Sequence, residues 1–232
     1  MKMKVAALQI IVSSNKDENF TSLERNLDLL ENEEIDCVVL PEMFSCPYQT
    51  HLFEKYSEIE GGESWLRLSE IAKKNKIYLV AGSVPEFADG HIYNTSYVFD
   101  RDGYQIAKHR KMHLFDIDVK NGQKFKESDT LSAGNSTTVF KTEFGIIGLC
   151  VCYDFRFPEL SRLMVDQGAK MILVPAAFNM TTGPSHRDIL FRTRALDNQV
   201  YTLGIAPARN PSSGYTSWGH SIVVSPWGDI IE

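Results

Sequence analysis

The chain has 232 residues, of which 43% are hydrophobic and 23% are charged, an ordinary balance for a globular protein that buries one sizeable core. A formal net charge of -6 excludes a broad basic surface, so we expect neither nucleic acid nor a membrane as a partner. No apolar run approaches the roughly 20 residues of a membrane helix. Four cysteines in a chain of this length indicate a reducing compartment, and we expect the cytoplasm.

Strands and helices are predicted to alternate along the first half of the chain. Apolar residues at helical spacing predict an amphipathic helix over 18–33, and a second helix is predicted over 63–76. Residues 93–111 are typical of a hairpin that turns at Arg101-Asp102-Gly103. The remaining predicted strands of this half are 4–10, 36–42 and 77–86.

The second half begins with a polar connection over 112–136, and a connection of that length is usually functional or mobile. A hairpin over 137–152 follows, and Pro158 is well suited to open a helix. Further strands are predicted over 169–178, 200–208 and 220–229, with a helix over 185–199. The pattern indicates a single α/β domain, 1–232, whose hairpins exclude a simple doubly wound parallel sheet.

Two cysteines, Cys150 and Cys152, lie one residue apart near the end of an apolar strand. Cys152 comes last before the predicted helix, and such a strand–turn–helix context can project a nucleophile from a sheet edge. Strand alternation places Cys150 on the same face, one step deeper, and most cysteines simply pack in a core. The C-x-C spacing fits neither a metal site nor an unstrained disulfide. The pattern alone leaves open which cysteine reacts.

Two charged residues end other predicted strands. Glu42 closes 36–42, and Lys111 closes the hairpin. Glu42 could be an ordinary surface cap, and Lys111 could belong to a solvated basic edge. If these two strand ends and Cys152 converge, Glu42 can take the thiol proton and Lys111 can stabilise an oxyanion.

The segments "LPEMF", "HRKMHLFD" and "CVCYDFRFPEL" occur in this order, and together they resemble the three signature segments of the nitrilase superfamily of carbon–nitrogen hydrolases. The resemblance extends along practically the whole chain. It implies a four-layer α-β-β-α sandwich and a homodimer or higher homo-oligomer. It also implies catalysis by Glu42, Lys111 and Cys152, with Glu127 as a second glutamate and no metal or organic cofactor. Lys111 and the Tyr153 backbone N–H are then the expected donors to the oxyanion.

Within the superfamily, "CYDFRFPE" and the later segments "APARN" and "WGHSIVVSPWGDII" resemble omega-amidases, which hydrolyse the terminal amide of 2-oxoglutaramate and 2-oxosuccinamate. One departure is Arg187, where omega-amidases generally have Trp. Arg156 is a candidate for binding the distal carboxylate, although it could instead brace Glu159 or Asp154. The other expected pocket residues flank the motifs: Tyr48, His113, Phe178, Asn179 and Met180.

Two alternatives stay open beside the omega-amidase interpretation. A deaminated-glutathione amidase would need a longer and more open pocket, and a catalytically silent dimerising scaffold would keep the fold without the reaction. The resemblance also implies a further C-terminal segment that supports the dimer. The sequence ends at "GDIIE", so we expect that segment to be absent and the dimer to be less secure.

Overall fold

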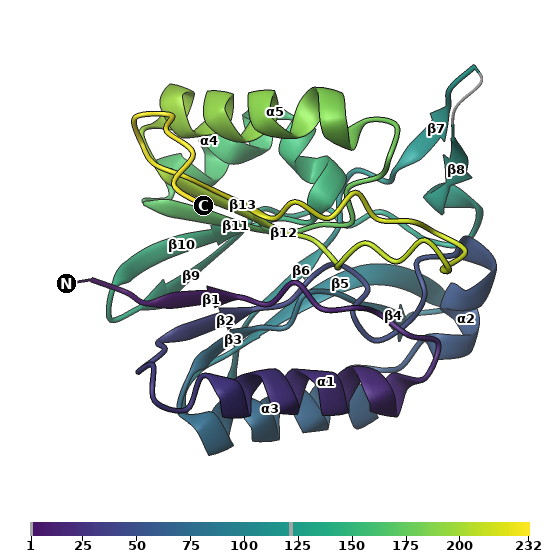
Figure 1. Ribbon diagram of the computed structural model, residues 1–232, viewed down its shortest axis with the longest axis horizontal. Coiled ribbons are helices and arrows are strands. Elements are labelled where there is room, and N and C mark those ends of the chain that lie inside the picture. Colours follow the sequence, from purple (N-terminus) through teal and green to yellow (C-terminus); the bar gives the residue numbers. More distant parts are fainter. Residues whose placement is uncertain (1, 121–122) are drawn as a thin grey trace.

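Two β-sheets lie face to face between two pairs of helices in the computed structural model, which describes residues 2–120 and 123–232 (Figure 1). Helices α1 (Lys16–Leu29) and α3 (Glu63–Asn75) cover one sheet. Helices α4 (Pro158–Asp166) and α5 (Gly183–Asn198) cover the other. The predicted four-layer α-β-β-α sandwich is therefore confirmed.

The first sheet combines parallel strands with a hairpin. Strands β1 to β3 are parallel neighbours, and β5 pairs antiparallel with β3, β4 and β6. The bounds are β1 (Val5–Ala7), β2 (Cys37–Val39), β3 (Tyr78–Val80), β4 (Val84–Ala88), β5 (His91–Phe99) and β6 (Gln105–Arg110).

One strand prediction in this sheet was wrong, because the single strand expected over 77–86 is divided into β3 and β4. The division occurs at Gly82, which has a φ of +57°, a conformation that favours glycine. A Cβ atom there would lie 2.0 Å from the Pro41 carbonyl oxygen. The close approach of this turn to Pro41 supports the backbone immediately before Glu42.

The second sheet has the strand order β13-β12-β11-β10-β9. Strands β10, β11 and β12 are parallel, so their carboxyl ends meet at one edge, while β9 and β13 pair antiparallel at the two sides. The bounds are β9 (Thr138–Thr142), β10 (Gly145–Leu149), β11 (Met171–Pro175), β12 (Tyr201–Ile205) and β13 (Ile222–Val224).

The predicted strand over the two cysteines ends early, at Leu149. Cys150 is fully buried in the apolar layer between this sheet and helices α4 and α5. Cys152 instead begins the short 3₁₀ turn η3 (Cys152–Arg156). The expectation that both cysteines share one strand face is therefore wrong, because the chain leaves the strand before either of them.

The connection after β6 contains more structure than its polar sequence predicts. It forms the antiparallel pair β7 (Asp116–Asp118) and β8 (Lys124–Lys126), followed by the 3₁₀ turn η2 (Glu127–Asp129). Two residues of the predicted connection over 112–136, 121 and 122, lie outside the described part. The remaining short elements are η1 (Thr50–Leu52) and α2 (Phe53–Tyr56). None of the helices described is long and apolar enough to cross a membrane.

Candidate active site

Glu42, Lys111 and Cys152 each follow the end of a strand, and the two sheets bring these ends together. Glu42 comes after β2 and Lys111 directly after β6, both in the first sheet, whereas Cys152 comes after β10 in the second. The Glu42 backbone N–H donates to the carbonyl of Ala176, just past β11, at 3.3 Å. This bond joins the two sheets at the edge where the three side chains lie.

The Lys111 side chain is fully buried between two carboxylates. Its Nζ lies 2.8 Å from Glu42 Oε1 and 2.8 Å from Glu127 Oε2. Burial alone would lower the pKa of Lys111, but the charges of Glu127 and Glu42 raise that pKa above its ordinary value. The ammonium therefore stays charged, which suits the stabilisation of negative charge and not proton abstraction.

Glu42 keeps one carboxylate oxygen free. Its Oε1 accepts hydrogen bonds from Lys111 and, at 2.8 Å, from Asn94 Nδ2. Its Oε2 is buried and has no hydrogen-bond partner among the described residues. Burial raises the pKa of Glu42, Lys111 opposes that rise, and the neighbouring Glu127 carboxylate adds to it. A carboxylate with a raised pKa and an oxygen left without a partner among the described residues is suited to accept the thiol proton.

The Cys152 backbone is in the left-handed region, with a φ of 45°. A non-glycine residue there is strained, and such strain is concentrated at functional sites. Burial raises the pKa of the Cys152 thiol, the nearby Glu42 carboxylate raises it further, and Lys111 lowers it. The resting side chain is therefore a neutral thiol that needs a base, and Glu42 is the adjacent one.

Glu127 and Tyr48 complete the polar cluster. Glu127 Oε1 accepts from the Tyr48 hydroxyl at 2.7 Å, and Oε2 accepts from the Phe115 N–H at 2.6 Å. Asn94, which none of the sequence motifs predicts as a site residue, is fully buried and donates to Glu42. The only signal in the sequence is an amide side chain among the aromatic and hydroxyl-bearing residues of the strand segment "YNTSY".

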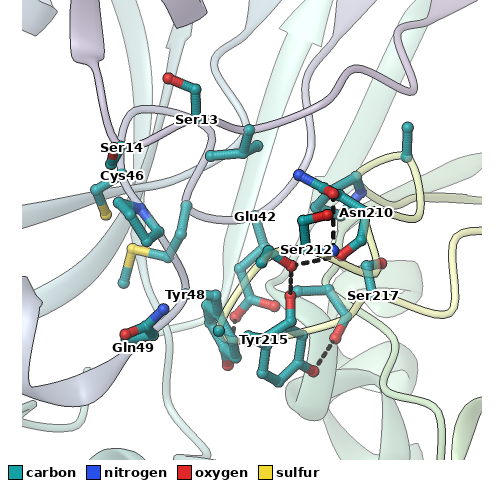
Figure 2. Close-up of a pocket in the computed structure, with 18 residues that line it drawn as sticks. Ser13, Ser14, Glu42, Cys46, Tyr48, Gln49, Asn210, Ser212, Tyr215 and Ser217 are labelled. Carbon is teal, nitrogen blue, oxygen red and sulfur yellow. Dashed lines mark hydrogen bonds between the residues drawn. The ribbon is translucent and has the colours of Figure 1, made fainter.

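Two cavities open on this cluster, and Ala177 lines both. The larger has a volume of about 310 Å³. Figure 2 shows Glu42, Tyr48 and Tyr215 grouped in it, with Asn210, Ser212 and Ser217 alongside. The smaller has a volume of about 40 Å³ and holds Cys152. Three of its lining residues carry basic side chains: Arg156, His186 and Arg187.

The predicted pocket residues are distributed between the two cavities and other positions. Tyr48 lines the larger cavity, and Arg156, Phe178 and Asn179 line the smaller one. The Asn179 side-chain oxygen accepts from the N–H groups of Thr181 and Thr182, so it also fixes its own turn. Arg156 braces neither Glu159 nor Asp154 but lies 2.9 Å from His186 Nδ1.

Two predicted pocket residues lie elsewhere. Met180 is 43% exposed and lines neither cavity. His113 also lines neither cavity, because its ring stacks on Phe157 with centroids 3.6 Å apart and its Nδ1 lies 2.8 Å from Asp154. Both residues flank motifs in the sequence, but their strand ends turn these side chains away from the cavities.

The fold and the composition of the site agree with a comparison of the whole sequence. Residues 4–232 match the family described as carbon-nitrogen hydrolase, and the chain belongs to that family. It is a hydrolase of the class that acts on carbon–nitrogen bonds, as the sequence motifs predicted.

Particular relatives lie close to this chain. It is 50% identical to nitrilase homolog 2 of Dictyostelium discoideum, covering 98% of this chain and 70% of the relative. It is 46% identical to omega-amidase NIT2 of Xenopus tropicalis, covering 99% of this chain and 83% of the relative. Among solved structures, Nit3 of Saccharomyces cerevisiae, a member of branch 10 of the nitrilase superfamily, superimposes with a TM-score of 0.90 at 42% identity, over 99% of this chain and 84% of that one.

Proposed function

We propose that this chain is an omega-amidase that releases ammonia from the terminal amide of small 2-oxo acids such as 2-oxoglutaramate and 2-oxosuccinamate. The observation that carries the proposal is the buried Oε2 of Glu42, which has no hydrogen-bond partner among the described residues and lies beside the Cys152 thiol and the Lys111 ammonium. The omega-amidase names of relatives at 45–46% identity support the substrate class.

The first half of the reaction forms a thioester. Glu42 takes the proton of the Cys152 thiol while Cys152 Sγ attacks the amide carbon, and the carbonyl oxygen becomes an oxyanion. Glu42 then gives the proton to the amide nitrogen, the carbon–nitrogen bond breaks, and ammonia leaves. The raised pKa of Glu42 suits both the uptake and the release of this proton.

Lys111 and the Tyr153 N–H are the proposed donors to the oxyanion. Tyr153 lies in the first turn of η3, where backbone N–H groups have no intrahelical acceptor. The ammonium of Lys111 is held by Glu42 and Glu127, so its charge needs no rearrangement during the reaction. One preorganised donor of this kind typically lowers the barrier by about 3 kcal/mol.

The second half of the reaction hydrolyses the thioester and regenerates the free enzyme. A water molecule loses a proton to Glu42 and attacks the thioester carbon, and the tetrahedral intermediate expels the Cys152 sulfur. The proton on Glu42 returns to that sulfur, and the carboxylic acid product leaves. Glu127 holds Lys111 and Tyr48 in place through both halves of the reaction.

The distal carboxylate of the substrate is proposed to bind among the basic residues of the smaller cavity. Arg156 and Arg187 both line it together with Cys152. The Nε of Arg187 is buried and has no partner among the described residues. Guanidinium groups bind carboxylates with directed, charge-assisted hydrogen bonds, which favours an acyl group that ends in a carboxylate.

The test compares kcat/KM for 2-oxoglutaramate, its methyl ester at the distal carboxylate, and deaminated glutathione. We expect 2-oxoglutaramate to be the best substrate, and Arg156→Met to lower its kcat/KM by about 10- to 100-fold while leaving the ester almost unaffected. Preference for deaminated glutathione would assign the chain to that activity instead. Absence of ammonia release from all three would favour the silent scaffold.

A further inference from the structure

Asp154 is a buried carboxylate, two residues after Cys152, that accepts hydrogen bonds from two directions. Its Oδ1 accepts from the backbone N–H groups of Met112 and His113, at 3.0 and 2.8 Å, and from His113 Nδ1 at 2.8 Å. Its Oδ2 accepts from the buried His109 Nε2 at 2.9 Å and from the Val151 N–H at 3.1 Å. Five N–H donors thus converge on one side chain.

These donors belong to the two segments that carry Lys111 and Cys152. His109, Met112 and His113 surround Lys111 along the end of β6 and the residues after it. Val151 immediately precedes Cys152, and Asp154 lies in the same turn. The segments come from different sheets, and the Asp154 carboxylate joins them directly behind the site.

We propose that Asp154 is a positioning residue, whose carboxylate holds the strained Cys152 turn in register with the Lys111 strand end. The inference rests on the proposed function in taking Cys152 as the nucleophile. Asp154 does not line either cavity, so it acts through the two segments and not on the substrate. A displacement of about 1 Å between nucleophile and oxyanion donor can lower a rate by about 100-fold.

Only an ionised carboxylate satisfies this arrangement. All five groups donate, so both oxygens of residue 154 must accept, whereas the amide of an asparagine would direct N–H groups at some of these donors. Burial alone would raise the pKa of Asp154, but the hydrogen bonds from His109 and His113 lower it below its usual range. The side chain therefore remains an acceptor throughout the pH range in which the protein is used.

Asp154→Asn tests the proposal, and Glu86→Gln is its matched control. Glu86 is also a buried carboxylate and also binds this strand, through Arg110 and Lys108, but it forms no hydrogen bond or ion pair with residues 152–156 of the Cys152 turn. Both variants lose a buried negative charge that hydrogen bonds from neighbouring residues stabilise. The measurements, made on folded protein, are kcat and KM for 2-oxoglutaramate and the rate at which iodoacetamide alkylates Cys152, followed by mass spectrometry.

We expect Asp154→Asn to lower kcat by about 100-fold with little change in KM, and to change the rate at which Cys152 is alkylated. We expect Glu86→Gln to leave kcat, KM and the alkylation rate near their wild-type values. Values for Asp154→Asn equal to those of Glu86→Gln would overturn the proposal, as would a lower kcat with unchanged alkylation. If Asp154→Asn does not fold, His113→Ala decides. It removes the hydrogen bond from His113 Nδ1 to Asp154, together with the ring stacking on Phe157, at a partly exposed position. We expect a smaller loss of kcat and a change in alkylation, while unchanged values would overturn the proposal.

The failure of the proposed function is a separate outcome. If the wild-type protein hydrolyses no omega-amide, the proposed function is wrong and the kinetic comparison cannot be made. The alkylation rates of Asp154→Asn and Glu86→Gln still support or overturn the proposed positioning of Cys152.

Discussion

At the scale of single residues, the chemistry of the site depends on three charged side chains buried together, those of Glu42, Lys111 and Glu127. Glu42 and Glu127 lie on either side of the Lys111 ammonium, so each carboxylate influences the other through the same cation. Lys111 has a single charge for two partners, and burial weakens solvent screening. Burial raises the pKa of Glu42, Lys111 opposes that rise and the Glu127 charge adds to it, while Lys111 itself stays protonated.

Glu127→Gln is predicted to move the acidic limb of the kcat/KM profile to lower pH. Glu42 acts as a base only when ionised, so activity is lost as pH falls through its raised pKa. Removing the negative charge of Glu127 lowers that pKa, because repulsion disappears and Lys111 interacts with Glu42 alone. We also expect kcat to fall by about 100-fold.

The measurement is a pH–rate profile with 2-oxoglutaramate for wild type, Glu127→Gln and Glu159→Gln. Glu159 is an exposed carboxylate in the first turn of α4, so its removal is expected to leave the limb in place. A limb in Glu127→Gln that stays in place or moves to higher pH would contradict the coupling.

The motif residues Glu42, Lys111, Cys152 and Glu127 were predicted through the family resemblance, because the residue types alone left open which cysteine reacts. Asn94 could not be predicted, because one buried amide in a strand carries no spacing signal. The pocket residues were harder still: Met180 follows Asn179 directly, yet only Asn179 lines a cavity. Whether a side chain enters a cavity depends on the local turn, which the sequence pattern does not specify.

At the scale of elements, the spacing of apolar residues predicted the helices and the hairpins, but it did not predict where the strands end at the site. The strand toward Cys152 stops at Leu149, and the strand after Ile77 is divided at Gly82. Both errors have one cause, because apolar side chains continue past the last ladder hydrogen bond and bury themselves in the turns. These turns orient Glu42 and Cys152.

Glu86→Gln is predicted to destabilise the first sheet by about 1 to 2 kcal/mol at neutral pH, because it leaves the partly exposed cations of Arg110 and Lys108 without their carboxylate. Glu86 on β4 accepts from Arg110 and Lys108 of β6 and from Thr95 of β5. Burial alone would raise the pKa of Glu86, but hydrogen bonds from Arg110, Thr95 and Lys108 lower it to about 2. The stabilisation is therefore complete above the ordinary glutamate pKa and is lost as pH falls toward 2.

Urea unfolding of wild type and Glu86→Gln at pH 7 and pH 3 measures this effect. We expect the difference in unfolding free energy to be large at pH 7 and smaller at pH 3. Equal midpoints at pH 7, or a difference that grows on acidification, would contradict the ion-pair network.

At the scale of the whole molecule, the site exists because two sheets of different chain segments stack. An apolar layer between the sheets holds them together, with members from both: Val39, Val80 and Val98 from the first, and Leu149, Leu173 and Leu203 from the second. Composition and alternation predicted an α/β domain, whereas the four-layer arrangement followed from the family resemblance. Stacking of distant segments leaves no periodic pattern in a single sequence.

The family resemblance implies a homodimer or higher homo-oligomer, and we propose that the chain forms a homodimer through the outer face of helices α4 and α5. Leu163 on α4 is 51% exposed and Ile189 on α5 is 66% exposed. Light scattering after size exclusion is expected to give twice the mass of one chain, and Leu163→Asp with Ile189→Asp is expected to halve it. Leu29→Asp, on the opposite helical layer, is the control. A wild-type protein that is monomeric at every concentration would contradict the proposal.

The most direct test of the central claim is ammonia release by Cys152→Ala and Cys150→Ala, with the acid-quenched reaction analysed by mass spectrometry. The two residues are separated only by Val151, but Cys150 is buried in the layer under α4 and α5 while Cys152 faces Glu42. We predict that Cys152→Ala releases no ammonia and carries no acyl adduct, while Cys150→Ala keeps most of the activity and forms the adduct on Cys152. Ammonia release that survives in Cys152→Ala, or an adduct on Cys150, would contradict the account.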